Sequence, residues 1–191
     1  MHCSPSGGVA LAALLALGAC GTPAPVDMGA PFTPPRSTWL TGAKPTKPMG
    51  AACPVRFGAF IDTRSDPHEM GEIGLRPIHA ADPSAWARSG FEALGRDPRI
   101  VVADPSASDA VVLEVEILKA YMLALPTTKS VNLVFRVHYS GRGGDTARVY
   151  RGVDTDMNWN SGSDETQSSF NRALAQVVEA VDTDIVARCG S

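Results

Sequence analysis

AVVLEVEILKAYMLALPTTKSVNLVFRVHY, residues 110–139, is the stretch that decides the fold. Apolar and polar residues alternate along 110–122 and again along 131–139, which is the period of a β-strand with one buried face. Pro126 lies between the two runs, and a proline is not tolerated inside a central strand. The sequence therefore predicts a long β-hairpin that turns at Pro126.

A turn centred on Pro126 also fixes the register of this hairpin. It places Glu116 opposite Arg136 and Glu114 opposite His138 on the polar face, and each such pair contributes roughly 0.2–1 kcal/mol. The same register gathers apolar residues of both strands on the core face: Val111, Leu113, Val115, Ile117, Val131, Leu133, Phe135, Val137 and Tyr139. Charge and apolar patterns agree on one pairing, which strengthens the prediction.

Three further segments, residues 55–62, 99–103 and 147–157, have the character of strands. The first alternates, so that Val55, Phe57, Ala59 and Ile61 are expected on one face, and a loop through Gly71 and Gly74 follows it. The second is a brief apolar run, and the third is less regular.

Two amphipathic helices complete the pattern. Asp82 followed by Pro83 provides the N-cap and first-turn residues of a helix that ends near Leu94. A second helix begins at Asp164 or Thr166. Its apolar residues recur at helical spacing and form one buried stripe: Phe170, Leu174, Val177, Val181 and Ile185.

The long strands and the helices follow one another in the order β-α-β-β-β-α. This order predicts a single α+β domain over residues 53–191, with a largely antiparallel sheet and both helices packed on one face.

The N-terminal residues have the pattern of an export signal. The apolar run from Val9 to Ala19 would reach only ~16 Å as a helix, too short for a bilayer. Leu17-Gly18-Ala19-Cys20 resembles a bacterial lipobox, in which the chain is cut between Ala19 and Cys20 and the cysteine receives a diacylglycerol and an N-acyl chain. The alternative is an ordinary secretory signal cut near Ala19, which leaves Cys20 a free thiol.

We therefore expect residues 1–19 to be a signal peptide and residues 20–52 to be a lipidated cysteine followed by a Pro-rich, disordered tether. Gly21, rather than Asp, follows Cys20. The resemblance then implies an outer-membrane lipoprotein that faces the periplasm of a Gram-negative cell. The lipid on Cys20 is the only attached group expected, and no cofactor is.

Two cysteines, Cys53 and Cys189, bracket the predicted domain. An exported chain meets an oxidising compartment, so a pair at these positions is expected to form a disulfide. Closing a loop of this length stabilises the fold by roughly 4–5 kcal/mol. The alternative is two unpaired, buried thiols.

Charge and motifs point away from several classes of function. The formal net charge is −3, without the basic field that nucleic-acid binding requires. Asp66, His68 and Glu69 lie too close together on one loop to converge on a metal ion, and we expect no metal site. Asp154 and Asp156 are better explained by solubility than by calcium binding. No catalytic constellation is present, and we expect a protein that is not an enzyme.

Apolar residues at the hairpin turn are the best candidates for a contact surface. Tyr121, Met122, Leu123 and Leu125 stand where polar residues are usual. They either contact a protein partner or lipid, or fold back onto the sheet. Trp159, in an Asn-rich loop, either contacts a ligand or covers the end of the core.

The whole arrangement resembles the YajG-type bacterial lipoproteins over residues 53–188. The resemblance rests on the lipobox, the tether and a pattern of elements: a strand that ends in Asp62-Thr63-Arg64, an Ile73-Gly74 pair, a helix ending near Leu94, a long hairpin, and a last helix with apolar residues around Phe170 and Leu174. It implies an auxiliary lipoprotein of an envelope transporter. We expect a non-enzymatic accessory or adaptor that is held on the membrane and docks on an envelope protein. The alternative is a periplasmic binding module for a lipid or cell-wall fragment.

Overall fold

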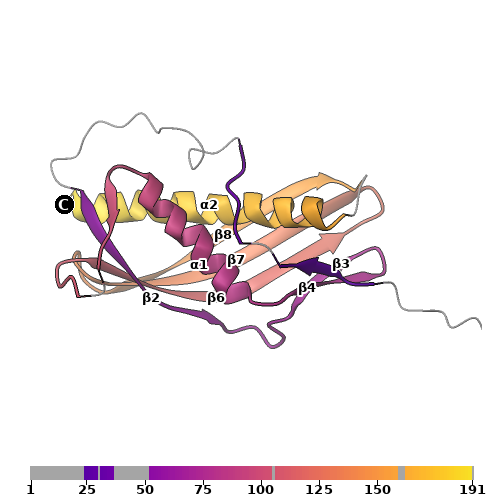
Figure 1. The fold of residues 1–191 in the computed structure, drawn as a ribbon, viewed down its shortest axis with the longest axis horizontal. Helices are drawn as coiled ribbons and strands as arrows, with labels where there is room; N and C mark the ends of the chain where they lie inside the picture. Colours follow the sequence, from indigo (N-terminus) through magenta and orange to yellow (C-terminus); the bar gives the residue numbers. More distant parts are fainter. Residues whose placement is uncertain (1–23, 30, 37–51, 105, 159–161, 191) are drawn as a thin grey trace, which may run out of the picture.

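The computed structural model describes residues 24–29, 31–36, 52–104, 106–158 and 162–190 (Figure 1). Ala19, Cys20 and Trp159 lie outside these ranges. The strands are β1 (Val26–Met28), β2 (Cys53–Asp62), β3 (Glu69–Ile73), β4 (Arg76–Ala80), β5 (Ile100–Val102), β6 (Val111–Ala124), β7 (Thr128–Gly141) and β8 (Thr146–Met157). The helices are α1 (Pro83–Glu92), the short 3-10 helix η1 (Ala93–Arg96) and α2 (Ser163–Cys189).

The predicted hairpin, β6 with β7, forms the middle of an open, mixed sheet. β7 pairs with β6 on one side and with β8 on the other, antiparallel in both cases. The other edge of β6 is divided between two strands. β2 runs parallel to its first half, and β3 runs parallel to it near the turn, at Met122. β5 extends the sheet from β2, and β4 and β1 extend it from β3. The prediction of a single α+β domain with a mostly antiparallel sheet is confirmed.

The predicted register of the hairpin is confirmed from Val111 to Ile117. Glu116 lies opposite Arg136 and Glu114 opposite His138. A β-bulge at Leu118 then shifts the pairing by one residue. Because the shift reverses the alternation, Met122 points into the core and is only 2 % exposed. The prediction of Met122 as a contact residue is therefore wrong.

A second bulge corrects the first predicted strand. The pairing of β2 with β6 shifts between Phe57 and Phe60. Phe60 therefore packs against the core, whereas Ala59 and Ile61, which we expected on the buried face, are exposed. Alternation along the sequence cannot reveal such a shift, since the extra residue leaves the pattern on each side intact.

Part of the expected tether belongs to the sheet instead. Val26, Met28 and Phe32 are buried in the main core, and β1 pairs parallel with β4. The Phe32 main-chain N–H also donates to Ser89 Oγ of α1, at 2.9 Å. Hence residues 24–29 and 31–36 are structural parts of the domain, and its ordered region begins earlier than the predicted residue 53.

The expected loop after β2 contains the β3–β4 hairpin. Gly71 of β3 has φ +93°, and a Cβ atom there would lie 2.3 Å from the Met122 main-chain oxygen. Only glycine fits a left-handed residue this close to a neighbouring strand. Gly71 therefore allows β3 to take its place beside the end of β6.

Both helices cover the same face of the sheet, with α1 crossing α2 in Figure 1. Asp82 caps α1 as predicted, since its Oδ1 accepts from the Ala85 N–H at 2.8 Å. The predicted stripe of α2 is fully buried: Phe170, Leu174, Val177, Val181 and Ile185. Trp86 of α1 packs edge-on against Phe170 and donates from Nε1 to Asn171 Oδ1, at 3.0 Å. Within the described ranges, none of the helices combines the length and the apolar character needed to cross a bilayer.

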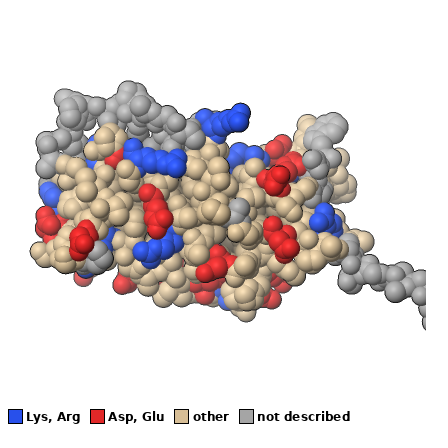
Figure 2. All heavy atoms as spheres, in the orientation of Figure 1, with Lys and Arg blue, Asp and Glu red and all other residues tan. Residues whose placement is uncertain are grey.

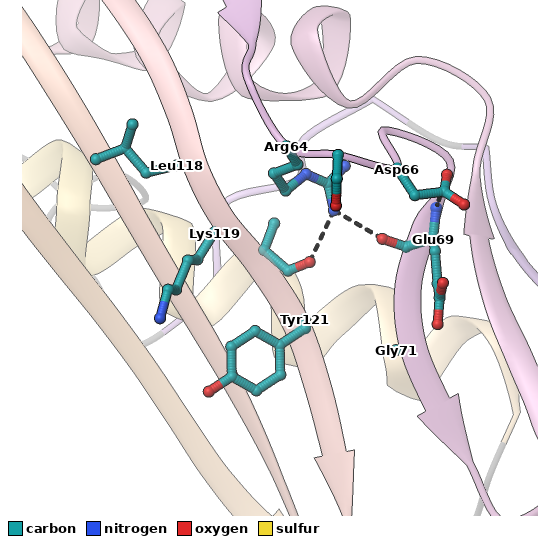
Figure 3. A pocket seen from close by; sticks show the side chains of 9 residues that line it. Arg64, Asp66, Glu69, Gly71, Leu118, Lys119 and Tyr121 are labelled. Carbon is teal, nitrogen blue, oxygen red and sulfur yellow. Dashed lines mark hydrogen bonds between the residues drawn. The ribbon is translucent and has the colours of Figure 1, made fainter.

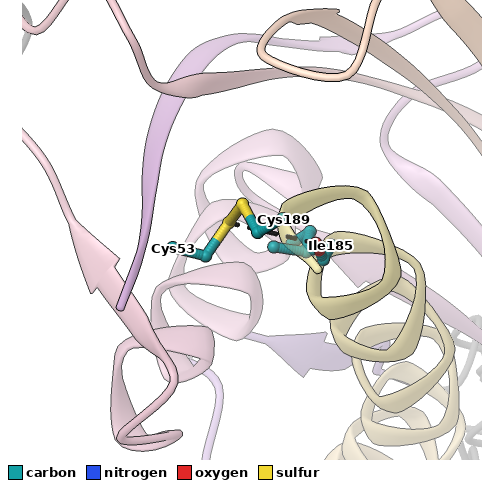
Figure 4. Close-up of a disulfide and its surroundings, with 3 residues drawn as sticks. All are labelled: Cys53, Ile185 and Cys189. Atoms are coloured by element: carbon teal, nitrogen blue, oxygen red, sulfur yellow. Dashed lines mark hydrogen bonds between the residues drawn. A yellow bond between two sulfur atoms is a disulfide. The ribbon is translucent and has the colours of Figure 1, made fainter. Parts of the chain in front are cut away.

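A disulfide joins Cys53, the first residue of β2, to Cys189, the last residue of α2 (Figure 4). Their Cα atoms are 5.7 Å apart, and Cys53 Sγ lies 3.9 Å from the Ile185 carbonyl oxygen. The expected pairing is thus present in the structure. It fastens the end of the last helix to the start of the parallel strand.

Candidate functional site

The edge of β6 has a gap where β2 ends and β3 has not yet begun. Thr63 makes the last contact from the β2 side, since its N–H and its hydroxyl both donate to the Ile117 carbonyl, at 3.2 and 3.0 Å. β3 reaches β6 only at Met122. The bulge at Leu118 falls between these two points, so the main chain of β6 is irregular where it lacks a strand neighbour.

The side chain of Arg64 bridges this gap (Figure 3). Its Nη1 donates to the Ala120 carbonyl at 2.9 Å and to the Glu69 carbonyl at 2.7 Å, which ties β6 to the start of β3. Its Nη2 donates to the Pro67 carbonyl at 2.6 Å. The guanidinium therefore satisfies main-chain oxygens that a neighbouring strand would otherwise pair with.

Asp62 holds Arg64 in this position. The two side chains form a fork-shaped ion pair, with Nε to Oδ1 at 2.9 Å and Nη2 to Oδ2 at 2.6 Å, and both are almost buried. The Asp62-Thr63-Arg64 motif is thus a structural joint. The donors of Arg64 are directed to protein oxygens, so this arginine is not placed to bind a ligand.

A shallow groove of about 450 Å³ opens beside the joint. Figure 3 shows Arg64, Asp66 and Glu69 on one side of it and Leu118, Lys119 and Tyr121 of β6 on the other. Charges of both signs line this groove, and it is wide open to solvent. Its chemistry does not select one class of small molecule.

The residues weighed as metal ligands are used otherwise. Asp66 Oδ1 accepts from the main-chain N–H groups of His68 and Glu69, at 3.0 and 3.2 Å, in a local turn. His68 Nδ1 lies 3.3 Å from the Ala80 carbonyl. Asp154 and Asp156 both accept from Arg172 of α2, at 2.8 and 3.2 Å. Within the described ranges no three His, Cys, Asp or Glu side chains are grouped to hold a metal ion.

The face of the sheet turned away from the helices, here called the open face, carries exposed apolar side chains. One row across the strands runs from Ile61 through Glu116 and Arg136 to Val149. Glu116 accepts from Arg136 Nη1 at 2.7 Å, and its other oxygen lies 3.1 Å from His138 Nε2. Ile61, Val149 and Val153 are each about half exposed on this face. The open face is therefore a mixed surface with apolar positions around a satisfied polar centre.

Where the open face ends at the hairpin turn, it carries a further apolar group, here called the apolar tip: Tyr121, Leu123, Leu125 and Met157. These side chains are 41, 54, 53 and 55 % exposed. Together they are four of the ten large hydrophobic side chains exposed in the described part of the chain. The sequence identified Tyr121, Leu123 and Leu125 but not Met157, which joins them because Thr128 pairs with it across the β7–β8 ladder. A hollow of about 410 Å³ lies beside Pro126 and Met157.

Three polar clusters between α2 and the rest of the domain were not predicted. Lys129 of β7 is buried and ion-paired with Glu165 in the first turn of α2. Near the other end of the helix, the Tyr139 hydroxyl donates to the Tyr150 hydroxyl, which in turn donates to the Asp184 carboxylate. Burial raises the pKa of both tyrosines, so they stay neutral donors.

The third cluster joins η1, β5 and α2. Arg99 donates to Asp97 from its main-chain N–H at 2.8 Å and from Nη2 at 2.6 Å, and also reaches Asp182 of α2, at 3.1 Å. Both carboxylates are buried. Such clusters join residues distant in sequence, which local patterns cannot pair. They attach α2 at several points, and so they have a structural role.

No family model matches this chain, and no curated protein matches it. Solved structures do share its fold. Protein XCC0632 of Xanthomonas campestris, of family DUF330, is similar with a TM-score of 0.57 and 13% sequence identity, over 87% of this chain and 94% of that one. A minor lipoprotein of Acinetobacter baumannii is similar with a TM-score of 0.44 and 10% identity, over 71% of this chain and 94% of that one. At these identities the first likeness shows the fold alone.

Proposed function

We propose that this protein is a membrane-anchored bacterial lipoprotein that serves as a non-enzymatic accessory or adaptor in the cell envelope. The lipobox ending in Cys20 supports the anchor. Gly21 after that cysteine favours the outer membrane and a domain that faces the periplasm. The YajG-type resemblance supports an auxiliary role beside an envelope transporter.

The contrast between a closed interior and an exposed apolar surface carries this proposal. Helix α2 lies directly on β8: a Cβ atom at Gly152 would be 2.0 Å from the Ala173 carbonyl oxygen. Likewise a Cβ atom at Gly90 of α1 would be 2.5 Å from Leu174 Cδ2. A lipid or glycan carrier needs room beneath its helices, whereas here α2 is in direct contact with β8 and α1 is in direct contact with α2. The open face, by contrast, presents apolar side chains to solvent.

Charge on the surface fits a protein partner better than a polyanion. Figure 2 shows acidic and basic side chains interspersed on the face that it presents, without a continuous basic area. The formal net charge of −3 agrees with that distribution. A mixed surface with apolar positions is the usual composition of a protein–protein contact.

The experiment is crosslinking in cells that carry the full chain, followed by membrane purification and mass spectrometry. A variant with Val149→Ser and Val153→Ser tests the open face. A matched variant, Val101→Ser with Val102→Ser, removes two similarly exposed valines of β5. We expect one identified envelope complex with the wild type and the β5 variant, and its loss with the open-face variant. Recovery of a bound lipid or glycan in place of any protein would favour the binding module instead.

The anchor is tested separately. We expect the wild type to incorporate labelled palmitate and to stay in the membrane fraction after alkaline washing, because multiple acyl chains hold a protein stably. Cys20→Ser should lose both properties. An unlabelled wild type that is washed off the membrane would contradict the lipoprotein assignment.

A further inference from the structure

The apolar tip lies at the same end of the molecule as the start of the described chain. Met122 pairs with Gly71 of β3, and Val26 of β1 pairs with Ile78 of β4, where β4 runs beside β3. Val26 is therefore near the level of Met122, three strand spacings or ~14 Å away across the sheet. In Figure 1 the indigo strand β1 begins at the end of the molecule where β8 finishes and α2 starts.

The direction of β1 decides where the preceding residues lead. β1 is parallel to β4, β4 is antiparallel to β3, and β3 is parallel to β6. β1 therefore runs opposite to β6, which itself runs toward the tip. The chain that precedes Val26 must leave the domain on the tip side. Arg76 fixes this exit, since its Nε donates to the Ala24 carbonyl at 2.9 Å.

Chain length then limits how far the tip can stand from a lipid on Cys20. Val26 is six residues after Cys20, so the Cα atom of Cys20 can be at most ~20 Å from the sheet even when the chain is fully extended. From Met122 to Leu125 the hairpin itself projects ~10 Å in the same direction. The hairpin therefore projects over about half of the largest possible distance between the sheet and Cys20.

We propose that the apolar tip inserts into the surface of the phospholipid bilayer that holds Cys20. Leu123, Leu125 and Met157 enter the boundary between headgroups and acyl chains, and Tyr121 lies at headgroup level with its hydroxyl in water. This inference rests on the proposed lipid anchor. It assigns the tip to lipid and leaves the rest of the open face, around Val149, for the protein partner.

Burial of apolar area favours this arrangement. Each of the three aliphatic side chains exposes about half of its surface to water, and transfer of that area to lipid is favourable at ~25 cal/mol per Å². The lipid anchor removes most of the entropic cost of bringing the tip to the surface, because it keeps the tip at high local concentration. A tip too weak to bind membranes alone therefore inserts when the chain is anchored.

A photoreactive amino acid tests this in living cells. A benzophenone side chain replaces Leu125 in the full, anchored chain, and a matched chain carries it at Val101 of β5. Val101 is 51 % exposed, comparable to Leu125, but it pairs with Pro54 of β2, beside the far end of β6. After illumination, mass spectrometry of the purified protein identifies phospholipid adducts.

We expect phospholipid adducts at position 125 at least tenfold above those at position 101. Leu123→Ser combined with Met157→Ser should lower the adducts at position 125 severalfold while the chain stays in the membrane fraction. Protein adducts at 125 in place of lipid, equal lipid adducts at both positions, or none at either in a membrane-bound chain would overturn the insertion and leave the anchor intact. A wild type without lipid on Cys20 would overturn the anchor, and this inference with it.

Discussion

The guanidinium of Arg64 donates to the Ala120 carbonyl over 2.9 Å, so a side chain bonds the edge of β6 that faces away from β7, between the levels of β2 and β3. The same group also reaches the Pro67 and Glu69 carbonyls. Because β2 and β3 meet the same edge of β6 at different levels, this side chain links β6 to the start of β3 in the interval between them.

Arg64→Ala should therefore be strongly destabilising. The change leaves the almost buried Asp62 carboxylate without its partner and three carbonyls without their donor, and loss of one member of a buried pair costs about 3–5 kcal/mol. Urea unfolding followed by circular dichroism measures the change. Arg142→Ala removes an exposed arginine of the β7–β8 turn and should stay within about 0.5 kcal/mol of the wild type. A loss below about 1 kcal/mol in the Arg64 variant would contradict the role assigned to this residue.

Asp97 should make the free energy of unfolding depend on pH in the acidic range. Its burial alone would raise the pKa, but the side-chain and main-chain hydrogen bonds from Arg99 outweigh this effect and lower the pKa from 3.8 to about 2. In the unfolded chain the Asp97 carboxylate is protonated near pH 4, whereas in the folded chain it is protonated only near pH 2. The contribution, about 2 kcal/mol, is thus complete above pH ~4 and disappears as the pH falls through ~2.

Urea midpoints at about pH 5, 4, 3 and 2 measure that dependence. Asp97→Asn should flatten it over this interval, whatever its effect at neutral pH. Asp109→Asn, which changes an exposed carboxylate, should keep the wild-type slope. Equal slopes in the wild type and the Asp97 variant would show that Asp97 titrates normally.

Gly152→Ala should separate α2 from the sheet. The new methyl group would lie 2.0 Å from the Ala173 carbonyl oxygen, and backbone on both sides would have to move. We expect a loss of at least about 2 kcal/mol in the free energy of unfolding. Gly29→Ala is the matched change, because a Cβ atom there has no neighbour within 4 Å. Similar stabilities for the two variants in thermal unfolding would argue against direct contact between α2 and β8.

Adding a reductant should lower the stability of the wild type but not that of a variant without Cys53 and Cys189. The Cys53–Cys189 bond spans 136 residues, and its removal releases about 5 kcal/mol of chain entropy in the unfolded state. The unfolding midpoint of the wild type should fall when dithiothreitol is added. Cys53→Ser with Cys189→Ser should have the lower midpoint in both conditions. A reductant-insensitive wild type would show that the two thiols are not bonded in solution.

Long amphipathic elements could be predicted from the sequence because several signals coincide on them. The charge pair of Glu116 with Arg136 and the apolar pair of Ile117 with Phe135 demand the same register, and the structure has it. The stripe from Phe170 to Ile185 is buried as its spacing indicates. The cap of α1 could also be predicted, because the bond from the Ala85 N–H to Asp82 lies within four consecutive residues.

What the sequence did not reveal depends on contacts between distant residues. The bulge at Leu118 turns Met122 inward, and no local pattern marks where an extra residue will be inserted. β1 lies in a Pro-rich stretch, and only its partner β4, some 52 residues later, makes a strand of it. The sequence did not reveal the role of Arg64 for the same reason, since the Ala120 carbonyl that it binds is 56 residues later, on β6.

The disulfide between Cys53 and Cys189 also has a consequence for the order of biosynthetic events. In a chain exported N-terminus first, Cys53 emerges long before its partner, which follows 136 residues later. Of the four cysteines in the sequence, Cys3 would leave with the signal peptide and Cys20 would be blocked as a thioether. On this route, acylation would leave Cys53 and Cys189 as the two free thiols among these four. Attachment to the membrane would then also prevent mispairing of cysteines, because one intramolecular disulfide would be the only one that could form.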